Sequence, residues 1–548
     1  MLKASELLKE CGILLLIAAA VTALYGHALG FGFAYDDDPL IETNPYIKDP
    51  GYIGSFFLTD MWRLSRFPAS ANYYRPLDML SFYLDHAAWG LNARMFHLTN
   101  ILLFILTSLL VYTVIRAVSG SRLASILGTA IFIVHPVSGI AACWISGRNE
   151  PLFLIFTLAS FLMFRQADNS KSSSGRVFLC AGSAMMFALG LLSKEAALFL
   201  LPLLAWHDYC FTCDFSVKRI LKKLINYLPL FVVAVVYLWA RYVALEGASG
   251  IYIRHPKEMP LATCLALTLK SIPYYIKSAL FPFPLEFQAL KIPVVPSPDL
   301  AGIAATICLI CFLLHYGFRY GLSFKKEVFF LGWAAITSAN VLFVAILMGP
   351  RFLLFPLIGI AGFSGIFAAG RKKLIIYGVT LALIISMAVS SYCNTLHWKD
   401  NSTLLELMVK KYPKDPIIIY QIGCAYSLRN DLPSAIAKYK EALDIQWDVK
   451  EARFNLAHAY FNLGRFDDAI TEFEELAKHN GLMPQIHQAL AVIYEKKDLY
   501  GKAIKEVQYE LSLGTPEYAK MLLFLYQLYE ENGESPKALR IRKLLLNY

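Results

Sequence analysis

The feature that most constrains this chain is a series of apolar runs, each about as long as a membrane-spanning helix. A helix needs about 20 apolar residues to cross the roughly 30 Å hydrocarbon core of a bilayer. Hydrophobic residues make up 57% of the 548 positions and charged residues only 17%, against about 45–50% and about 25% in a typical soluble domain. The sequence therefore predicts an integral membrane protein. Eleven runs are candidate spans: Cys11–Leu29, His97–Val118, Leu123–Ala141, Pro151–Phe164, Val177–Leu192, Ala196–Tyr209, Tyr227–Leu245, Leu300–Phe318, Val328–Leu347, Phe352–Ala369 and Leu374–Tyr392.

Basic residues concentrate in alternate loops between these runs, for example Arg116 with Arg122, and Arg371-Lys372-Lys373. Loops rich in lysine and arginine stay on the cytoplasmic side. We therefore expect a cytoplasmic N-terminus and an extracytoplasmic segment after Tyr392. The net charge of +10 is then explained by basic residues in the loops predicted to be cytoplasmic. No nucleic-acid partner is expected. The short inner loops suggest a bacterial or archaeal cell membrane.

One apolar segment, Leu261–Phe283, is not counted as a span. It contains Lys270, Pro273 and Lys277, and a span there would reverse the side of every later loop. We interpret it as an interfacial or re-entrant piece of a long outer loop, residues 246–299. The other outer loops of interest are residues 30–96 and 135–150.

After Tyr392 the sequence becomes charged and repetitive, with small and aromatic residues recurring every 34 positions. The recurring residues are Ile422-Gly423 and Tyr426, then Leu456-Ala457 and Tyr460, then Leu490-Ala491 and Tyr494, with Leu525 and Tyr529 in a slightly longer unit. A 34-residue period of helix pairs is typical of tetratricopeptide repeats. The predicted fold is thus all-α: a membrane helix bundle in residues 1–393, followed by an α-solenoid of about four repeats in residues 394–548. Such solenoids present a concave surface to peptides, although a purely structural stack is the alternative.

The predicted outer loops gather acids and bases. Asp36-Asp37-Asp38 directly follows the first span. The other charged groups on this side are Arg75, His135, Arg148, Glu150, Lys194, Glu195 and Arg351. Each alone is compatible with a side chain that reaches the membrane surface. Together they match glycosyl transfer from a lipid phosphate, in which a carboxylate deprotonates the acceptor hydroxyl and cations hold the phosphate.

Short motifs in these loops carry a family resemblance. They are Phe33-Ala34-Tyr35-Asp36-Asp37, Tyr74-Arg75-Pro76-Leu77, His97-Leu98-Thr99-Asn100, His135-Pro136, Trp144-Ile145-Ser146-Gly147-Arg148-Asn149-Glu150, Ser193-Lys194-Glu195 and Arg351-Phe352-Leu353-Leu354-Phe355-Pro356. With the C-terminal repeats, they make the chain resemble the transmembrane and tetratricopeptide-repeat O-mannosyltransferases and their prokaryotic relatives, in the GT-C glycosyltransferase superfamily. Members often carry an acid just before the arginine of the last motif, where this sequence has Pro350.

The resemblance implies an inverting enzyme that takes a monosaccharide, with mannose suggested by the family, from a polyprenyl-phosphate carrier to a protein Ser or Thr hydroxyl. It implies a catalytic Asp in the first outer loop, which we assign to Asp36, with Asp37 next; the choice among Asp36, Asp37 and Asp38 stays open. We expect Asp37 or Glu150 to assist. We assign substrate binding to Tyr74, Arg75, His135, Arg148, Lys194, Glu195 and Arg351, and peptide binding to the repeats. Transfer to a lipid or envelope polysaccharide is one alternative, and a non-catalytic membrane scaffold is another. Adjacent aspartates are compatible with a divalent cation, but we expect no obligatory metal or other cofactor.

Overall fold

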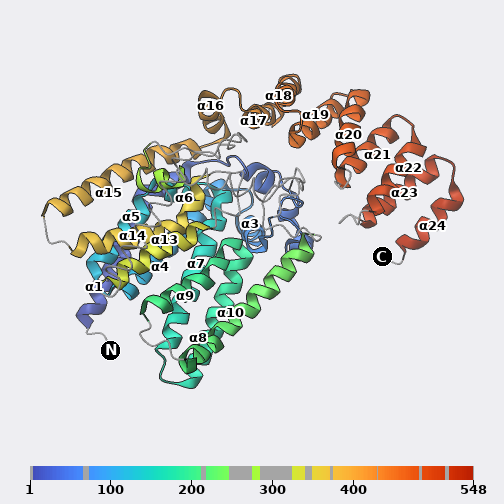
Figure 1. Cartoon of the computed structure of the whole chain (residues 1–548). Helices are drawn as coiled ribbons and strands as arrows, with labels where there is room; N and C mark the ends of the chain where they lie inside the picture. The colour runs from blue at the N-terminus through green and yellow to red at the C-terminus, as the bar shows by residue number, and fades with distance from the viewer. Residues whose placement is uncertain are drawn as a thin grey trace, which may run out of the picture. The chain divides into compact units, whose positions relative to one another are not determined.

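The computed structural model describes residues 4–65, 73–211, 217–245, 274–283, 324–339, 349–370, 374–428, 430–480, 484–512 and 518–546, and every regular element in these ranges is helical (Figure 1). The predicted all-α fold is confirmed. The described chain divides into two compact units, with a boundary between Asp400 and Asn401.

The first unit is a bundle of long helices joined at one end by short ones. Its α-helices are α1 (Ala4–Tyr25), α2 (Ile53–Phe56), α3 (Pro76–Trp89), α4 (Ala93–Ser119), α5 (Arg122–Val134), α6 (Pro136–Cys143), α7 (Asn149–Asp168), α8 (Ser173–Ser193), α9 (Leu200–Phe211), α10 (Val217–Ala244), α13 (Lys325–Ser338), α14 (Leu354–Gly370) and α15 (Leu374–Thr395). Its short turns include η1 (Gly26–Gly30), η2 (Asp38–Glu42), η3 (Tyr46–Lys48), η4 (Pro50–Tyr52), η5 (Ile145–Arg148), η6 (Glu195–Phe199), η8 (Pro350–Leu353) and η9 (Leu396–Trp398).

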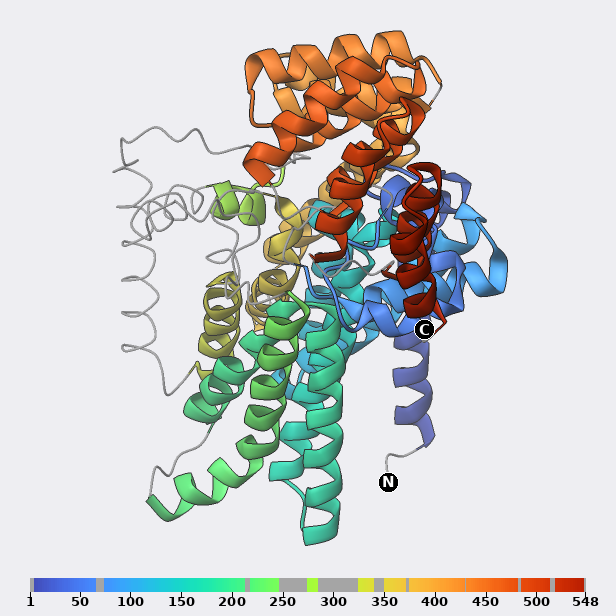
Figure 2. The ribbon, with the colours of Figure 1, turned by 90° about the vertical axis from the view of Figure 1, so that its right-hand side faces the viewer.

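Seven helical stretches within the described residues are long and apolar enough to cross a membrane, or eight if the bent pair α5 and α6 forms one span. Figure 2 shows several of these long helices running side by side. They account for seven of the predicted runs, and the exposed apolar side chains Leu15, Trp239 and Leu374 are suited to lipid. The chain is an integral membrane protein.

The remaining predicted spans differ from simple helices. The run Leu123–Ala141 bends by 67° between α5 and α6, because Pro136 has no N–H with which to continue the helix. The run Ala196–Tyr209 becomes the turn η6 and the 12-residue α9, which is shorter than a bilayer crossing. The run Leu300–Phe318 and the end of Val328–Leu347 lie outside the described residues, as does most of Leu261–Phe283.

The centre of the bundle is packed through glycines. A Cβ atom at Gly365 of α14 would lie 2.2 Å from the Ala124 carbonyl oxygen of α5, and one at Gly359 would lie 2.5 Å from the Phe330 carbonyl oxygen of α13. Small residues let membrane helices approach closely where no hydrophobic effect drives them together. The tight α5–α14–α13 contact fixes where the loops at the end of α5 and the start of α14 are held.

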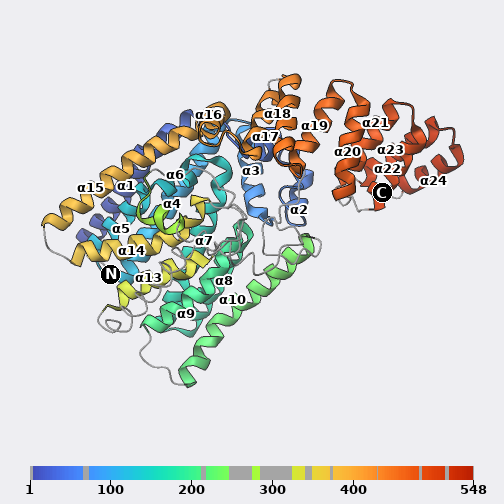
Figure 3. The same cartoon turned by 45° about the horizontal axis from the view of Figure 1, so that its top comes forward.

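The second unit is a succession of helix pairs that runs from left to right in Figure 3, from α16 to α24. Its helices are α16 (Asn401–Lys411), α17 (Pro416–Leu428), α18 (Leu432–Ile445), α19 (Lys450–Asn462), α20 (Phe466–Asn480), α21 (Pro484–Lys496), α22 (Tyr500–Ser512), α23 (Tyr518–Glu531) and α24 (Ser535–Leu545). The recurring small residues Ala457 and Ala491 are fully buried, and a Cβ at Gly423 would meet the Tyr439 ring at 2.5 Å. The predicted repeats are confirmed as antiparallel helix pairs.

Candidate active site at the loop-rich end of the bundle

The acidic triplet stands in a tight turn that fixes its three carboxylates differently. Tyr35, just before it, has a φ of +61°, a left-handed conformation that is uncommon for a residue with a side chain. Asp37 is 1% exposed and Asp38, the first residue of η2, is 6% exposed. Asp36 is only partly buried. Of the three, Asp36 is therefore the carboxylate most accessible to a substrate.

Asp37 ties the first loop to the second. Its Oδ1 accepts hydrogen bonds from the Ser146 backbone N–H at 2.7 Å and the Ser146 hydroxyl at 2.5 Å, and its Oδ2 accepts from the Ala34 N–H at 3.0 Å. Burial raises the pKa of Asp37 to about 7, although these hydrogen bonds act in the opposite direction. The geometry makes Asp37 an anchor that sets the position of its neighbour Asp36.

Trp144 is the aromatic centre on which several loops meet. Its ring is 5.9 Å from the Tyr35 ring and stacks on Trp398 at 4.9 Å. The guanidinium carbon of Arg351 lies 5.4 Å from the Trp144 ring centre and 5.2 Å from that of Phe352. In the part of the chain that the structure describes, no carboxylate forms an ion pair with Arg351. This cation is thus held by aromatic faces, with its charge left uncompensated.

The motif His97–Asn100, at the start of α4, braces both loops. His97 Nε2 donates to the Gly32 carbonyl at 3.2 Å. Asn100 donates from Nδ2 to the Trp144 carbonyl at 2.9 Å, and its Oδ1 accepts from Arg148 Nε at 2.7 Å. These contacts explain why the motif accompanies the acidic triplet, since it holds the backbone on either side of Trp144.

Arg148 is fully buried and already surrounded by acceptors. Besides Asn100, it meets Asp85 at 2.6 Å, the Phe96 carbonyl at 3.0 Å and the Ser81 carbonyl at 3.2 Å. The Ser81 hydroxyl lies at 3.4 Å from the same guanidinium. In this geometry Arg148 joins α3, α4 and α7.

A further ion pair, between Lys194 and Glu150, lies beside this network. Lys194 Nζ is 2.5 Å from Glu150 Oε1, with Phe153 and Phe352 ring centres at 5.2 and 5.3 Å. The ring of Phe352, a residue of η8, also contacts Arg351, so Lys194 and Arg351 share one aromatic neighbour. The two predicted cations are therefore brought together.

Arg75 forms a bidentate ion pair with Glu195. Its two nitrogens donate to the two Glu195 oxygens at 2.8 and 3.3 Å, and its guanidinium stacks over the Tyr73 ring at 4.2 Å. Burial raises the pKa of Glu195, but the charge and hydrogen bond of Arg75 outweigh it and bring that pKa to about 2. Arg75 and Glu195 thus form a closed pair that connects the first loop to η6.

The other predicted binding residues make structural contacts. Tyr74 donates its hydroxyl to the Phe57 carbonyl at 3.0 Å. His135 accepts at Nδ1 from the Val137 N–H, which caps α6, and its Nε2 lies 3.3 Å from the Ala279 carbonyl. Residues 274–280 of the outer loop are helical, so this loop reaches the site through His135.

Two further acids of the site, Asp78 and Asp85 on α3, are not among the residues predicted from the sequence. Asp78 is fully buried, and burial raises its pKa to about 7 while the charges of Arg75 and Arg148 oppose that rise. Its position one turn after Arg75, directly behind the motif Tyr74–Leu77, was the available signal. Asp85 is the partner of Arg148 and also accepts from the Thr99 hydroxyl at 2.9 Å.

No group of three or more His, Cys, Asp or Glu side chains within the described ranges is arranged to hold a metal ion.

The fold and this loop cluster define the class of protein: a polytopic helical membrane protein that carries tetratricopeptide repeats. A tetratricopeptide-repeat family model matches residues 428–493. The chain is 25% identical to the human Protein O-mannosyl-transferase TMTC3 over 86% of its own length and 55% of that protein. It is 23% identical to the mouse Protein O-mannosyl-transferase TMTC4 over 74% of its length and 63% of the relative, and 30% identical to mouse TMTC2 over 38% and 25%.

These similarities confirm the resemblance to the tetratricopeptide-repeat O-mannosyltransferases. The chain spans about half the length of the human relative it matches. Among solved structures, it matches ArnT from Cupriavidus metallidurans with 13% identity and a TM-score of 0.44, over 85% of this chain and 80% of that one. It matches MamA from Desulfovibrio magneticus RS-1 with 16% identity and a TM-score of 0.25, over 28% of this chain and 82% of that one.

Proposed function

We propose that this protein is a membrane glycosyltransferase that moves a monosaccharide from a polyprenyl-phosphate carrier to a Ser or Thr hydroxyl of a protein. The observation that carries the proposal is the anchored acidic turn. Asp37 is bound to Ser146 of the second loop, while its neighbour Asp36 stays partly exposed beside the aromatic cluster that holds Arg351. The names of the relatives, all O-mannosyl-transferases, support the class of reaction and suggest mannose.

In the proposed reaction Asp36 is the general base. Its carboxylate takes the proton of the acceptor hydroxyl while the hydroxyl oxygen attacks the anomeric carbon of the sugar. The bond between that carbon and the phosphate oxygen breaks, and the polyprenyl phosphate leaves with the bonding electron pair. Attack from the face opposite the phosphate inverts the anomeric configuration. Asp37 serves as the positioning residue for Asp36.

Two cations are proposed for the leaving phosphate. Arg351 has no carboxylate partner in the described residues, and Lys194 shares the Phe352 ring with it. Fixed positive charge at the leaving group stabilises the transition state without solvent rearrangement. Arg148 and Arg75, which are already paired with Asp85 and Glu195, are reassigned to positioning roles, together with Glu195, His135 and Tyr74. Glu150 holds Lys194, and the reaction as proposed requires no obligatory metal.

The repeats are proposed to hold the protein acceptor. Tetratricopeptide solenoids bind extended chains on their concave face, and the relatives' names indicate a protein substrate. With the orientation that the loop charges predict, transfer would take place on the extracytoplasmic side of a prokaryotic cell membrane.

The test uses purified protein in lipid nanodiscs with polyprenyl-phosphate mannose and Ser/Thr-containing peptides. Release of polyprenyl phosphate and mannosylation of the peptide are measured together. We expect Asp36→Asn to lower the rate by about 100-fold or more with an unchanged Tm. Asp49→Asn, an exposed carboxylate of the same loop, is the matched control and should keep full activity. Full activity of Asp36→Asn would show that another group is the base.

A further inference from the structure

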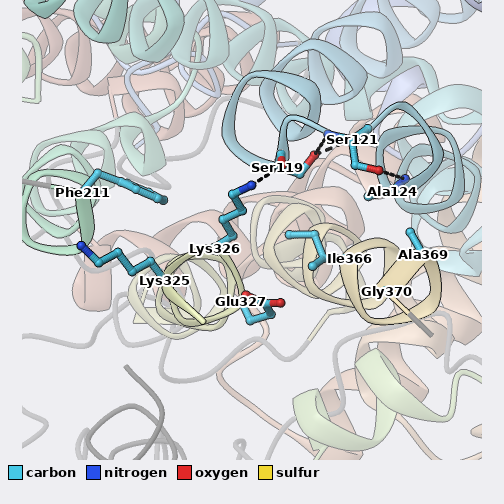
Figure 4. Close-up of a pocket in the computed structure, with 10 residues that line it drawn as sticks. All are labelled: Ser119, Ser121, Ala124, Phe211, Lys325, Lys326, Glu327, Ile366, Ala369 and Gly370. Atoms are coloured by element: carbon cyan, nitrogen blue, oxygen red, sulfur yellow. Dashed lines mark hydrogen bonds between the residues drawn. The ribbon is translucent and has the colours of Figure 1, made fainter. Parts of the chain in front are cut away.

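A cavity of about 550 Å³ lies at the end of the bundle remote from the candidate active site (Figure 4). It is lined by the end of α4, the start of α5, the end of α9, the start of α13 and the end of α14. Helix α14 connects the two places. It begins shortly after Arg351 and has 17 residues, ending at Gly370, so its two ends are about 25 Å apart at a rise of 1.5 Å per residue.

The lining is basic and receives the positive ends of two helices. Lys325 and Lys326 stand in the first turn of α13, and Ser121 caps α5 by accepting from the Ala124 N–H at 3.2 Å. Helix N-termini carry a partial positive charge that favours anions. Glu327 is the acid among the lining residues, so the lysines and the helix ends outweigh it.

Lys326 is the side chain that points to an anionic ligand. Figure 4 shows it reaching from α13 toward the end of α4, where its Nζ donates to the Ser119 carbonyl at 2.6 Å. A carbonyl is neutral, and no carboxylate in the described part of the chain forms an ion pair with Lys326. Its charge is therefore uncompensated within a cavity.

Three other basic residues at this end are paired with carboxylates. Arg122 meets Glu6 at 2.5 Å and Glu10 at 2.7 Å, and Arg116 approaches Glu10 at 3.7 Å. Lys9 is paired with Glu6 at 3.1 Å. These cations thus have carboxylate partners, whereas Lys326 has none among the described residues.

The position of the cavity relative to the membrane indicates which anion it would bind. The candidate spans that include α4 and α14 end at Ser119 and Gly370, so the lysines lie where a bilayer changes from hydrocarbon to headgroups. Phe211 and Ile366 add an apolar wall to the same cavity. Basic pockets between membrane helices bind anionic lipid headgroups.

We propose that this cavity binds the phosphate headgroup of an anionic phospholipid, with Lys326 and Lys325 as its cationic ligands and the acyl chains beside Phe211 and Ile366. The leaflet is the one that the loop charges predict to be cytoplasmic. The proposal does not depend on the glycosyltransferase assignment.

The test measures lipid retention by native mass spectrometry of the purified full-length protein in mixed phosphatidylglycerol and phosphatidylcholine. We expect the protein to retain phosphatidylglycerol preferentially. A charge near the surface contributes about fivefold in affinity, so Lys325→Gln with Lys326→Gln should weaken that preference about 25-fold. Lys9→Gln, an exposed lysine at the same end, is the control and should change nothing.

Three outcomes would overturn the proposal. The first is equal retention of the two lipids by the unaltered protein. The second is undiminished phosphatidylglycerol preference in the double variant, whose Tm is measured to verify folding. The third is displacement of the lipid by inorganic phosphate beyond the effect of sodium chloride at equal ionic strength, which would identify free phosphate as the ligand.

Discussion

At the scale of single residues, the candidate site contains two kinds of cation: some are paired with a carboxylate, and at least one has no carboxylate partner among the described residues. Arg148 is enclosed by Asp85, Asn100 and backbone carbonyls, and Arg75 is closed on Glu195. Arg351 has two aromatic faces and no carboxylate within the described residues. A buried pair resists change because breaking it strands a charge, whereas an uncompensated cation can exchange its surroundings for a substrate.

This difference predicts opposite consequences for two arginine substitutions. Arg351→Ala should lower transferase activity by about 100-fold or more, as loss of one transition-state donor does, while costing no more than about 1 kcal/mol of stability from its cation–π contacts. Arg148→Ala should destabilise the protein by about 3–5 kcal/mol, because Asp85 is left buried without its partner. Activity assays and thermal unfolding in detergent measure the two effects. An active Arg351→Ala variant would remove Arg351 from the proposed phosphate site.

Asp78 predicts a pH dependence of stability. Its folded-state pKa is about 7 against a usual 3.8, so between about pH 4 and pH 7 the folded protein keeps a proton that the unfolded chain releases. Stability therefore falls as pH rises through this window, by at most about 1.4 kcal/mol per pH unit for one group, and levels off above it. Asp37, with a similar pKa, contributes in the same window.

Asp78→Asn should remove the share of that slope that belongs to Asp78 and make the variant more stable than the unaltered protein at pH 8. Tm measured from pH 4 to pH 8 gives the two profiles. Asp49→Asn is the control and should leave the profile unchanged. Parallel profiles for the unaltered protein and Asp78→Asn would mean that Asp78 is ionised in the folded state throughout.

The sequence indicated which residues would gather but not how they pair. Asp36, Lys194 and Arg351 stood out because charged residues gather in the predicted outer loops and because these three lie in the motifs that carry the family resemblance. Arg75 and Glu195 are 120 positions apart and Glu150 and Lys194 are 44 apart, so their pairing depends on helix packing. From the sequence alone, Asp85 resembles an exposed acid on an amphipathic helix. Its pairing with Arg148 depends on the fold.

At the scale of elements, apolar length predicted most helices, but breaks depended on local chemistry. Pro136 lies inside an apolar run and still bends it by 67° between α5 and α6. The run Ala196–Tyr209 likewise divides into η6, which begins at Glu195, and the 12-residue α9. Hydropathy alone does not register the loss of one N–H or the burial of one ion pair, so it overestimates the number of straight spans.

The glycine contacts predict which helix positions tolerate a side chain. A Cβ at Gly365 would meet the Ala124 carbonyl oxygen at 2.2 Å and the Gly128 nitrogen at 2.7 Å, and these backbone atoms cannot yield by rotating. Gly365→Ala should separate α5 from α14 and cost about 1–3 kcal/mol of stability. Gly378→Ala on α15, where nothing lies within 4 Å, is the matched control. Thermal unfolding in detergent compares them, and equal Tm values would show that the α5–α14 contact is not limiting.

At the scale of the whole molecule, two units divide the work that the proposed function requires. The described bundle holds the acidic turn, Lys194 and Arg351, and the repeats after Asp400 form their own core around residues such as Tyr439, Phe473 and Leu490. The repeat period and the change in composition allowed both parts to be predicted, because each follows from a local pattern. Which acceptor the repeats select does not follow from any period, since it depends on the side chains of the concave face.

The division predicts that donor cleavage and acceptor transfer can be separated. A chain ending at Asp400 should still transfer mannose from polyprenyl-phosphate mannose to water or to a short Ser/Thr peptide at high concentration, with release of polyprenyl phosphate, since Asp36, Lys194 and Arg351 all remain. Its transfer to a folded or long protein acceptor should fall steeply through a raised KM, because the binding energy of the repeats is lost.

Gly423→Leu in the full-length chain provides a milder version, since its side chain would collide with the Tyr439 ring, already 2.5 Å from a Cβ. Gly501→Ala, with nothing within 4 Å, is its control. Unchanged KM for the long acceptor in the truncated protein would mean that the bundle alone selects the substrate and that the repeats bind a different partner.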